Sequence, residues 1–392
     1  MKLDAQLLGA AGRVVVRADP NCTEARITLS TADQSGPAAD AVRDATLESS
    51  PDGTVTASAQ QRQSGISVVQ SGPQPGAGNI VGDGYVVHNG NVVSSYYTNS
   101  PNGSSVSVVS HSGSGSIVAG RIDNLSFNNG NIQIGSIEGG AFVIGQAASP
   151  IEMEVIVPEG SSVECSTDSA NLETHGKVDV VEAKSATGSV SVEQATEARI
   201  ETDTGNVDVQ SAGAVQAESD TGNVTVQEAR TVRAESDTGN VTVGNAETVR
   251  AESDTGNVTV RNADKVNARS DTGAINIGTS KDATARSKTG AVSITDARGT
   301  AKASSGIGPV SVHATEGGKV TASSALRPVT VTASDKAVSD GLTVKAEGPP
   351  GQVRTPEGAN TGTSTAAGSD GSRSFNDANR ADRSRDAGTA RD

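Results

Sequence analysis

The stretch TVRAESDTGNVTVGNAE, residues 231–247, decides the fold of this chain because close copies of it recur at an interval of 17 residues. Its Asp-Thr-Gly triplet begins at five equally spaced positions, Asp203, Asp220, Asp237, Asp254 and Asp271. A constant period with recurring residue classes is typical of a solenoid, in which each copy is one coil stacked on the next. The repeat therefore predicts the architecture of much of the chain.

Alternation of apolar and polar residues on both sides of the triplet predicts the strands. Period-two alternation in runs of about five indicates two short, half-buried strands per coil, whereas no apolar stripe of helical spacing recurs. The regular inward positions are one column of β-branched residues, Val207, Val224, Val241, Val258, Ile275 and Val292. A facing column is mostly alanine, so the coil is expected to be thin. We expect an all-β, right-handed β-solenoid with 17-residue coils and two short strands per coil.

The remaining chain divides by composition. Residues 1–60 are expected to form an N-terminal β segment or cap, and residues 61–149 a Gly/Ser/Asn-rich insertion or irregular coils. The period slips to 18 or 19 residues at the ends of the repeat, which places the solenoid at 150–346 with nine or ten coils. Almost no apolar residue follows, so residues 347–392 are expected to be a disordered, charge-mixed tail.

The repeated triplet is interpreted as a turn. Aspartate side chains bond nearby backbone N–H groups, and glycine accepts a positive φ, so both residues suit a tight turn. The expected turn ladder is the five aspartates above together with Gly205, Gly222, Gly239, Gly256 and Gly273. Asp-Thr-Gly also occurs in aspartic proteases, but their two carboxylates share one cleft, which triplets on successive coils do not provide.

No cofactor is expected. Stacked aspartates leave Ca²⁺ as an alternative, but the Gly-rich nonapeptides of Ca²⁺-binding β-rolls are absent. The histidines His88, His111, His175 and His313 are dispersed, and no nucleophile–base pair is evident, so we expect no enzyme and no small-molecule substrate. A degenerate carbohydrate-active β-helix is the enzymatic alternative.

Composition bears on partners and location. The chain has 46 acidic and 31 basic residues, which disfavours general nucleic-acid binding. No stretch is apolar enough to span a bilayer, and the first 17 residues do not resemble a secretion signal, so a cytoplasmic location is expected. The alternative is a cell-surface or secreted protein exported by a non-classical route. Cys22 and Cys165 leave a single disulfide open.

A polar column follows the glycines. Asn223, Asn240 and Asn257, with a threonine two residues after each, form a regular grid on the outer surface. Asparagine ladders of this kind are expected to hydrogen-bond from coil to coil and stabilise the stack. An ice-binding surface is the alternative interpretation of the same grid.

The order of these segments resembles a known family. An N-terminal β segment, a strand that ends in Val-Pro-Glu-Gly (157–160) and repeated [Ser/Thr]-x-[Thr/Ser]-Gly-x-Val-x-Val motifs are similar to bacterial β-strand-repeat proteins of domain-of-unknown-function family 4097, often labelled putative adhesins. The resemblance covers roughly residues 10–345. It implies a β-solenoid related to the single-stranded β-helices, without established catalytic activity.

Charge along the repeat gives the strongest functional signal. Residues 201–260 are mainly acidic and residues 261–302 mainly basic. The candidate interaction ladder follows this change of sign: Glu201, Glu218, Glu235, Glu252, Arg269 and Arg286. A solvated face without a partner is the simpler interpretation. The sharper hypothesis is a structural scaffold that binds a protein partner or a second solenoid, staggered or head-to-tail.

Overall fold

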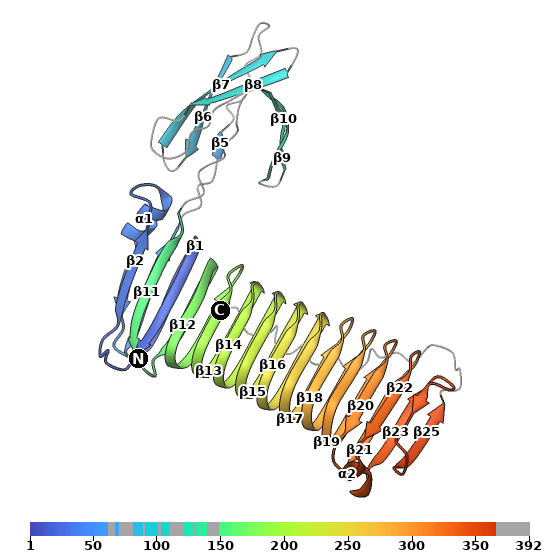
Figure 1. Cartoon of the computed structure of the whole chain (residues 1–392). Coiled ribbons are helices and arrows are strands. Elements are labelled where there is room, and N and C mark those ends of the chain that lie inside the picture. Colours follow the sequence, from blue (N-terminus) through green and yellow to red (C-terminus); the bar gives the residue numbers. More distant parts are fainter. Residues whose placement is uncertain are drawn as a thin grey trace.

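The computed structural model describes residues 1–61 and 149–365, and between them the segments 67–69, 81–88, 91–100, 103–109, 121–128 and 131–138. Side chains are described for residues 1–61 and 149–361. The chain is nearly all β, with 70% strand and 4% helix, and forms a β-solenoid of about 11 turns with parallel coils about 17 residues apart (Figure 1). The predicted fold class is confirmed.

Each central coil is one continuous strand. The coils are β13 (Val190–Thr204), β14 (Val207–Thr221), β15 (Val224–Thr238), β16 (Val241–Thr255), β17 (Val258–Ser270) and β18 (Ile275–Ser287). Neighbours pair in parallel with residue i opposite residue i+17. The β13–β14 ladder skips only at the bends near Gln210 and Gly213 and at Asp220 of the repeated triplet. The two predicted short strands are thus joined by a bend that keeps most of the pairing.

One hydrophobic core runs through the whole stack. The predicted inward columns are buried: Val224 and Val241 are 0% exposed, and Ala217 and Ala234 are 1% exposed. Burial alternates along each strand, which is the period-two pattern that the sequence predicts. Because valine faces alanine, each coil is thin and is stabilised mainly by the coils on either side.

The glycines of the turn have a different role from the predicted one. None of the five predicted glycines has a positive φ, so the interpretation based on left-handed backbone is wrong. A Cβ on Gly239 would instead lie 2.0 Å from the carbonyl oxygen of Gly222 on the preceding coil. The same approach recurs at Gly222 and Gly256. Glycine is required at this column because consecutive backbones touch there.

Serine and asparagine, and not aspartate, hold the turns together. The Ser253 hydroxyl donates to the carbonyl oxygen of Gly239 at 2.8 Å, and equivalent serines repeat this bond on neighbouring coils. The Asn223 Oδ1 accepts the backbone N–H of Asn240 at 2.9 Å and its side-chain amide at 3.1 Å. The predicted asparagine ladder is confirmed. No backbone N–H in the described turns donates to the carboxylates of the repeated Asp-Thr-Gly triplets, so that part of the prediction is wrong.

The N-terminal end is built from segments that are far apart in the sequence. β1 (Lys2–Asp19) is a complete coil that pairs in parallel with β12 (Ser162–Ser185) along almost its full length. On its other side lie β4 (Thr54–Gln60) and β11 (Ile151–Pro158), also parallel. The solenoid therefore begins near residue 2 and not at 150.

Antiparallel strands close this end. β2 (Arg26–Thr31) runs antiparallel to β11, and β3 (Thr46–Ser49) runs antiparallel to β4. The helix α1 (Pro37–Arg43) connects them and buries Ala38, Ala39 and Ala41 (Figure 1). The chain direction thus reverses at the outermost strands, which end the parallel stack.

The C-terminal coils lose the 17-residue period. β19 (Val292–Ser305) continues the stack, after which each wall receives separate short strands. β20 (Val310–Ala314), β22 (Val329–Ala333) and β24 (Val353–Arg354) extend one wall; β21 (Lys319–Ser324), β23 (Thr343–Gly348) and β25 (Asn360–Thr365) extend the other, with α2 (Asp335–Ser339) after β22. The predicted tail boundary at 347 is therefore wrong, because pairing continues to 365. Residues 366–392 lie outside the described part.

Asp296 connects three of these coils where the period changes. Its carboxylate accepts hydrogen bonds from the Thr279 and Thr315 hydroxyls and from Nε of Arg298 at 3.0 Å. The Arg298 hydrogen bond, followed by those of the two threonines, lowers the pKa of Asp296.

Between β4 and β11 the described strands form antiparallel pairs. β5 (Ser67–Val69), β6 (Val81–His88), β7 (Asn91–Ser100) and β8 (Gly103–Val109) form one sheet; β9 (Arg121–Asn128) and β10 (Asn131–Glu138) form another. His88 pairs with Asn91 and Asn128 with Asn131, so the β6–β7 and β9–β10 hairpins leave only an Asn-Gly pair between their strands. These strands pair with one another and not with the coils, so of the two predicted alternatives an insertion is favoured.

Candidate interaction surface

One broad side of the solenoid carries most of the repeated charge. It consists of the outward residues of the segment Ala214–Ser219, of Asp220 directly after it, and of the equivalent residues in the other coils; we call it the charged wall. In β14, Ala217 and Ser219 are buried while Gln216 and Glu218 are exposed, so every second side chain points to solvent. The wall therefore presents columns of side chains at ~4.8 Å from coil to coil.

The predicted ladder is one such column. The parallel register places its members opposite one another on consecutive coils: Glu201, Glu218, Glu235, Glu252, Arg269 and Arg286. The same register places Lys184 opposite Glu201. The acidic run is thus bounded by a cation at each end.

Both ends of the acidic column are paired within the chain. Nζ of Lys184 lies 3.1 Å from Glu201, and the hydrogen bond between them raises the pKa of the lysine. Nε of Arg269 lies 3.3 Å from Glu252. Sequence analysis missed Lys184, although its position 17 residues before Glu201 is the signal that would have found it.

Pairing inside the column is weaker. Arg233 and Arg250 lie 3.8 and 3.9 Å from the glutamates two residues after them. Each pair joins an exposed arginine to a partly buried glutamate, 28% exposed at Glu235 and 17% at Glu252. Ion pairs at such distances near the surface contribute little, roughly 0–1 kcal/mol each. In β14 the equivalent position is Gln216, and Glu218 has no hydrogen bond or ion pair to any described residue.

The turn beside this column adds a second row of carboxylates. We call Asp203, Asp220, Asp237 and Asp254 the edge aspartates; their carboxylates have no hydrogen-bond or salt-bridge partner in the described ranges. Asp271 differs: its carboxylate pairs with Lys288 and lies 3.6 Å from Arg269. Like charges at ~4.8 Å repel one another, so the edge aspartates and Glu218 form an unneutralised acidic strip.

Unpaired cations follow the acidic strip along the same wall. They are exposed and have no ionic partner in the described part of the chain: Lys265, Arg286, Lys302 and Lys319. Their columns are fixed by the pairs Thr248–Lys265, Thr284–Lys302 and Thr300–Lys319. The charge reversal seen in the sequence is therefore a reversal on one wall.

The opposite wall is almost neutral over the same coils. Its outward residues include the asparagine ladder and a column of Thr225, Thr242, Thr259, Asn276 and Ser293. Their hydroxyl and amide groups are hydrated without any need for a partner. Of the two broad walls, only the charged one has an electrostatic reason to bind.

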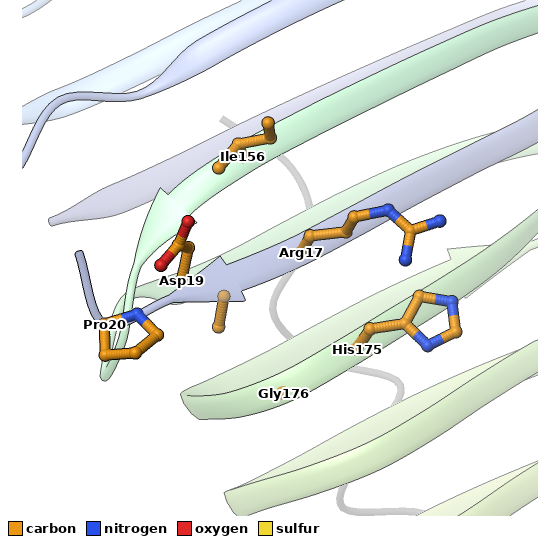
Figure 2. Close-up of a pocket in the computed structure, with 7 residues that line it drawn as sticks. Arg17, Asp19, Pro20, Ile156, His175 and Gly176 are labelled. Carbon is orange, nitrogen blue, oxygen red and sulfur yellow. The ribbon is translucent and has the colours of Figure 1, made fainter. Parts of the chain in front are cut away.

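A shallow hollow of about 340 Å³ lies near the N-terminal end, where β1, β11 and β12 turn. Figure 2 shows Arg17 and His175 beside each other at this place, with Ile156 of β11 and Asp19 at the end of β1 nearby. Arg17 already lies 3.2 Å from Glu154, and His175 lies 3.7 and 3.5 Å from Glu173 and Glu193. The hollow therefore has few uncommitted charges for a ligand.

The other predicted groups are separate. His313 contacts the Thr332 hydroxyl at 2.8 Å, far along the stack from His175. His88 lies in β6, where side chains are not described, and His111 lies outside the described residues. Cys22 and Cys165 do not pair; burial raises the pKa of Cys165 to about 12.

Within the described ranges, no three His, Cys, Asp or Glu side chains gather in an arrangement that could hold a metal ion. None of the helices described here is long and apolar enough to cross a membrane.

These features define a class of protein: a β-solenoid with one charged wall, one neutral wall and a closed N-terminal end. Comparisons with family models, with curated proteins and with solved structures found no match to this chain. The resemblance to the bacterial β-strand-repeat family stays a prediction.

Proposed function

We propose that this protein is a non-enzymatic scaffold that associates with protein partners through its charged wall. The observation that carries the proposal is the acidic strip, in which Glu218 and the four edge aspartates lie on successive coils without partners. The free energy of their mutual repulsion falls when cationic groups approach. A protein surface that presents lysine or arginine is the partner class that this chemistry favours.

The regular spacing adds selectivity to this attraction. Because the coils hold the carboxylates in a straight row, a partner with an equally ordered row of cations can pair with several of them at once. Each exposed pair is weak, roughly 0.2–1 kcal/mol, so binding depends on several pairs together. Such binding is strong at low salt and is screened when the Debye length falls.

A matched pair of variants tests the proposal. In one, the four edge aspartates are changed to asparagine; in the other, four exposed acids outside the wall, Glu24, Glu48, Glu159 and Glu357, are changed to glutamine. Both variants have the same net charge. Fluorescence anisotropy with a labelled oligolysine measures binding at low salt. We expect the aspartate variant to bind about tenfold more weakly and the control to match the wild type. Equal binding by the two variants would refute a specific role for the strip.

We propose a cytoplasmic location for this scaffold. The unpaired cysteines support it, because thiols stay reduced in the cytosol and tend to pair in oxidising compartments. Cell fractionation measures the location. Recovery of the protein only from the cell surface or the medium would favour the exported adhesin instead.

A further inference from the structure

We infer that the partner of the charged wall is a second copy of this chain, docked face to face with its solenoid axis reversed. The inference rests on the proposed function and identifies the partner. Its basis is symmetry: a column whose charge changes sign about one point becomes complementary to itself when it is turned end over end. The point on this wall lies between Glu252 and Arg269, which pair on adjacent coils.

A two-fold axis through that point, parallel to the strands, fixes the contacts. Each column then faces the same column of the second copy, and a residue n coils before the axis faces the residue n coils after it. In the ladder column Glu252 faces Arg269, and Glu235 faces Arg286. In this antiparallel arrangement opposite charges face each other. If the two copies were aligned in parallel, glutamate would face glutamate.

Charges on the other columns follow the same rule. The register of the coils supplies these further facing pairs: Asp237 with Lys288, Glu197 with Lys319, Glu182 with Lys345, and Lys184 with Glu347. One facing pair, Asp254 with Asp271, has like charges, and there Asp271 is already paired with Lys288 of its own chain. The arrangement therefore matches charge along the whole wall and not only at its centre.

The arrangement also places cations that the single chain leaves unpaired. Arg286 of one copy faces Glu235 and stands beside Asp237 of the other. Lys302 faces Gln216 and stands beside Glu218, the glutamate without an in-chain partner. Unmatched cations and unmatched carboxylates of one chain thus become neighbours in the pair.

The closed N-terminal end favours contact through the side. β2 and β3 run antiparallel to the stack, so a second solenoid cannot continue the parallel coils at that end. A two-fold contact through the wall is self-complementary and is complete with two copies. The expected assembly is a dimer, not a filament.

Charge reversal with rescue tests the arrangement on the full chain. Sedimentation velocity at low and high salt is expected to show a dimer that dissociates as salt increases. E235R and R286E should each raise the dimer Kd about tenfold or more. The combined E235R/R286E variant should restore dimerisation, because the two positions are three coils or roughly 14 Å apart in one chain and can pair only between chains. E247R, an equal charge change at the bend outside the wall, is the control and should dimerise normally.

Zero-length carbodiimide cross-linking checks the register independently. We expect cross-linked peptides that join Asp237 to Lys288 and Glu197 to Lys319; the second pair is seven coils or roughly 34 Å apart within one chain. A monomer at low salt, or failure of the double variant to restore the dimer, would overturn the antiparallel dimer. If the protein is monomeric but the oligolysine assay still separates its two variants, only this inference fails and the proposed function stands.

Discussion

The central coils and the N-terminal end reach the same stacked geometry by different routes. In β14 to β16 each residue has a near-identical neighbour 17 positions away, and the core is valine and alanine. At the N-terminal end, the coil β1 is enclosed by β4, β11 and β12, and the largest buried side chains are Leu3, Leu7, Ile151 and Met153. Repetition stabilises the centre through backbone contact, whereas the end depends on the volume of its side chains.

Breaking the backbone contact of the centre should have the largest effect. Gly239→Val places a branched side chain where a Cβ is already 2.0 Å from the Gly222 carbonyl oxygen. Because the obstacle is backbone, side-chain rotation cannot relieve it, and we expect a loss of about 4 kcal/mol. Thermal unfolding followed by circular dichroism measures it. Thr238→Ala, an exposed neighbour in the same turn, should change little; equal effects of the two variants would contradict the close-approach explanation.

Removing buried side-chain volume should have the second-largest effect, and its size should differ between the two regions. Leu7→Ala at the N-terminal end should cost about 3 kcal/mol, and Val226→Ala in the centre about 2 kcal/mol, because fewer buried carbons are lost. Since each coil contacts only its neighbours, the damage should stay local. Hydrogen exchange should rise in β1, β4 and β12 for the first variant and in β14 to β16 for the second. A uniform rise along the stack would argue against this local coupling.

Deleting a turn hydroxyl tests the repeated contacts at smaller scale. Ser253→Ala removes the donor to the Gly239 carbonyl and should cost about 1 kcal/mol, because that partly buried oxygen loses a partner. The half-exposed Ser323, in β21, offers the control Ser323→Ala. The difference between their urea midpoints is the measurement, and no difference would mean that the serine column is dispensable.

Acid should affect the irregular coils around Asp296 slightly. The folded-state pKa of Asp296 is lowered, so its contribution is present above the unfolded pKa of about 3.9 and is lost as the pH falls through the folded value. Asp296→Asn should therefore flatten the decline in melting temperature below about pH 5. Asp208→Asn, whose carboxylate has no described partner, is the comparison; an identical decline in both variants would exclude Asp296 as a source.

The repeat made the centre of the fold predictable and its ends unpredictable. The 17-residue period predicts which residues lie opposite one another on successive coils. The pairing of columns such as Val224, Val241 and Val258 therefore follows from the sequence. β1 has no such copy, so its alternation of Leu3, Ala5 and Leu7 gave no sign that residues 162–175 pair with it. At the other end, longer connections such as the one that holds α2 separate coils that still stack.

Particular residues show why the turn and the insertion are harder to predict from the sequence than the central coils. Glycine suits both a positive φ and a close backbone approach, and sequence alone does not separate these causes at Gly239. The pairs Asn89-Gly90 and Asn129-Gly130 are typical of two-residue hairpins, and that signal was available but unused. The sequence places the charged ladder on one column, as the register shows. That the ladder ends at Lys184 is evident from the register.

The interchangeable coils have a consequence for the length of the molecule. Because β15 and β16 make the same contacts, excision of residues 224–240 would bring Asn223 next to Val241 and leave every column continuous. The solenoid would shorten by one step of ~4.8 Å, which small-angle scattering of such a variant would measure. Gain or loss of 17 codons therefore changes the length of this protein by one coil, and the contacts between coils stay the same.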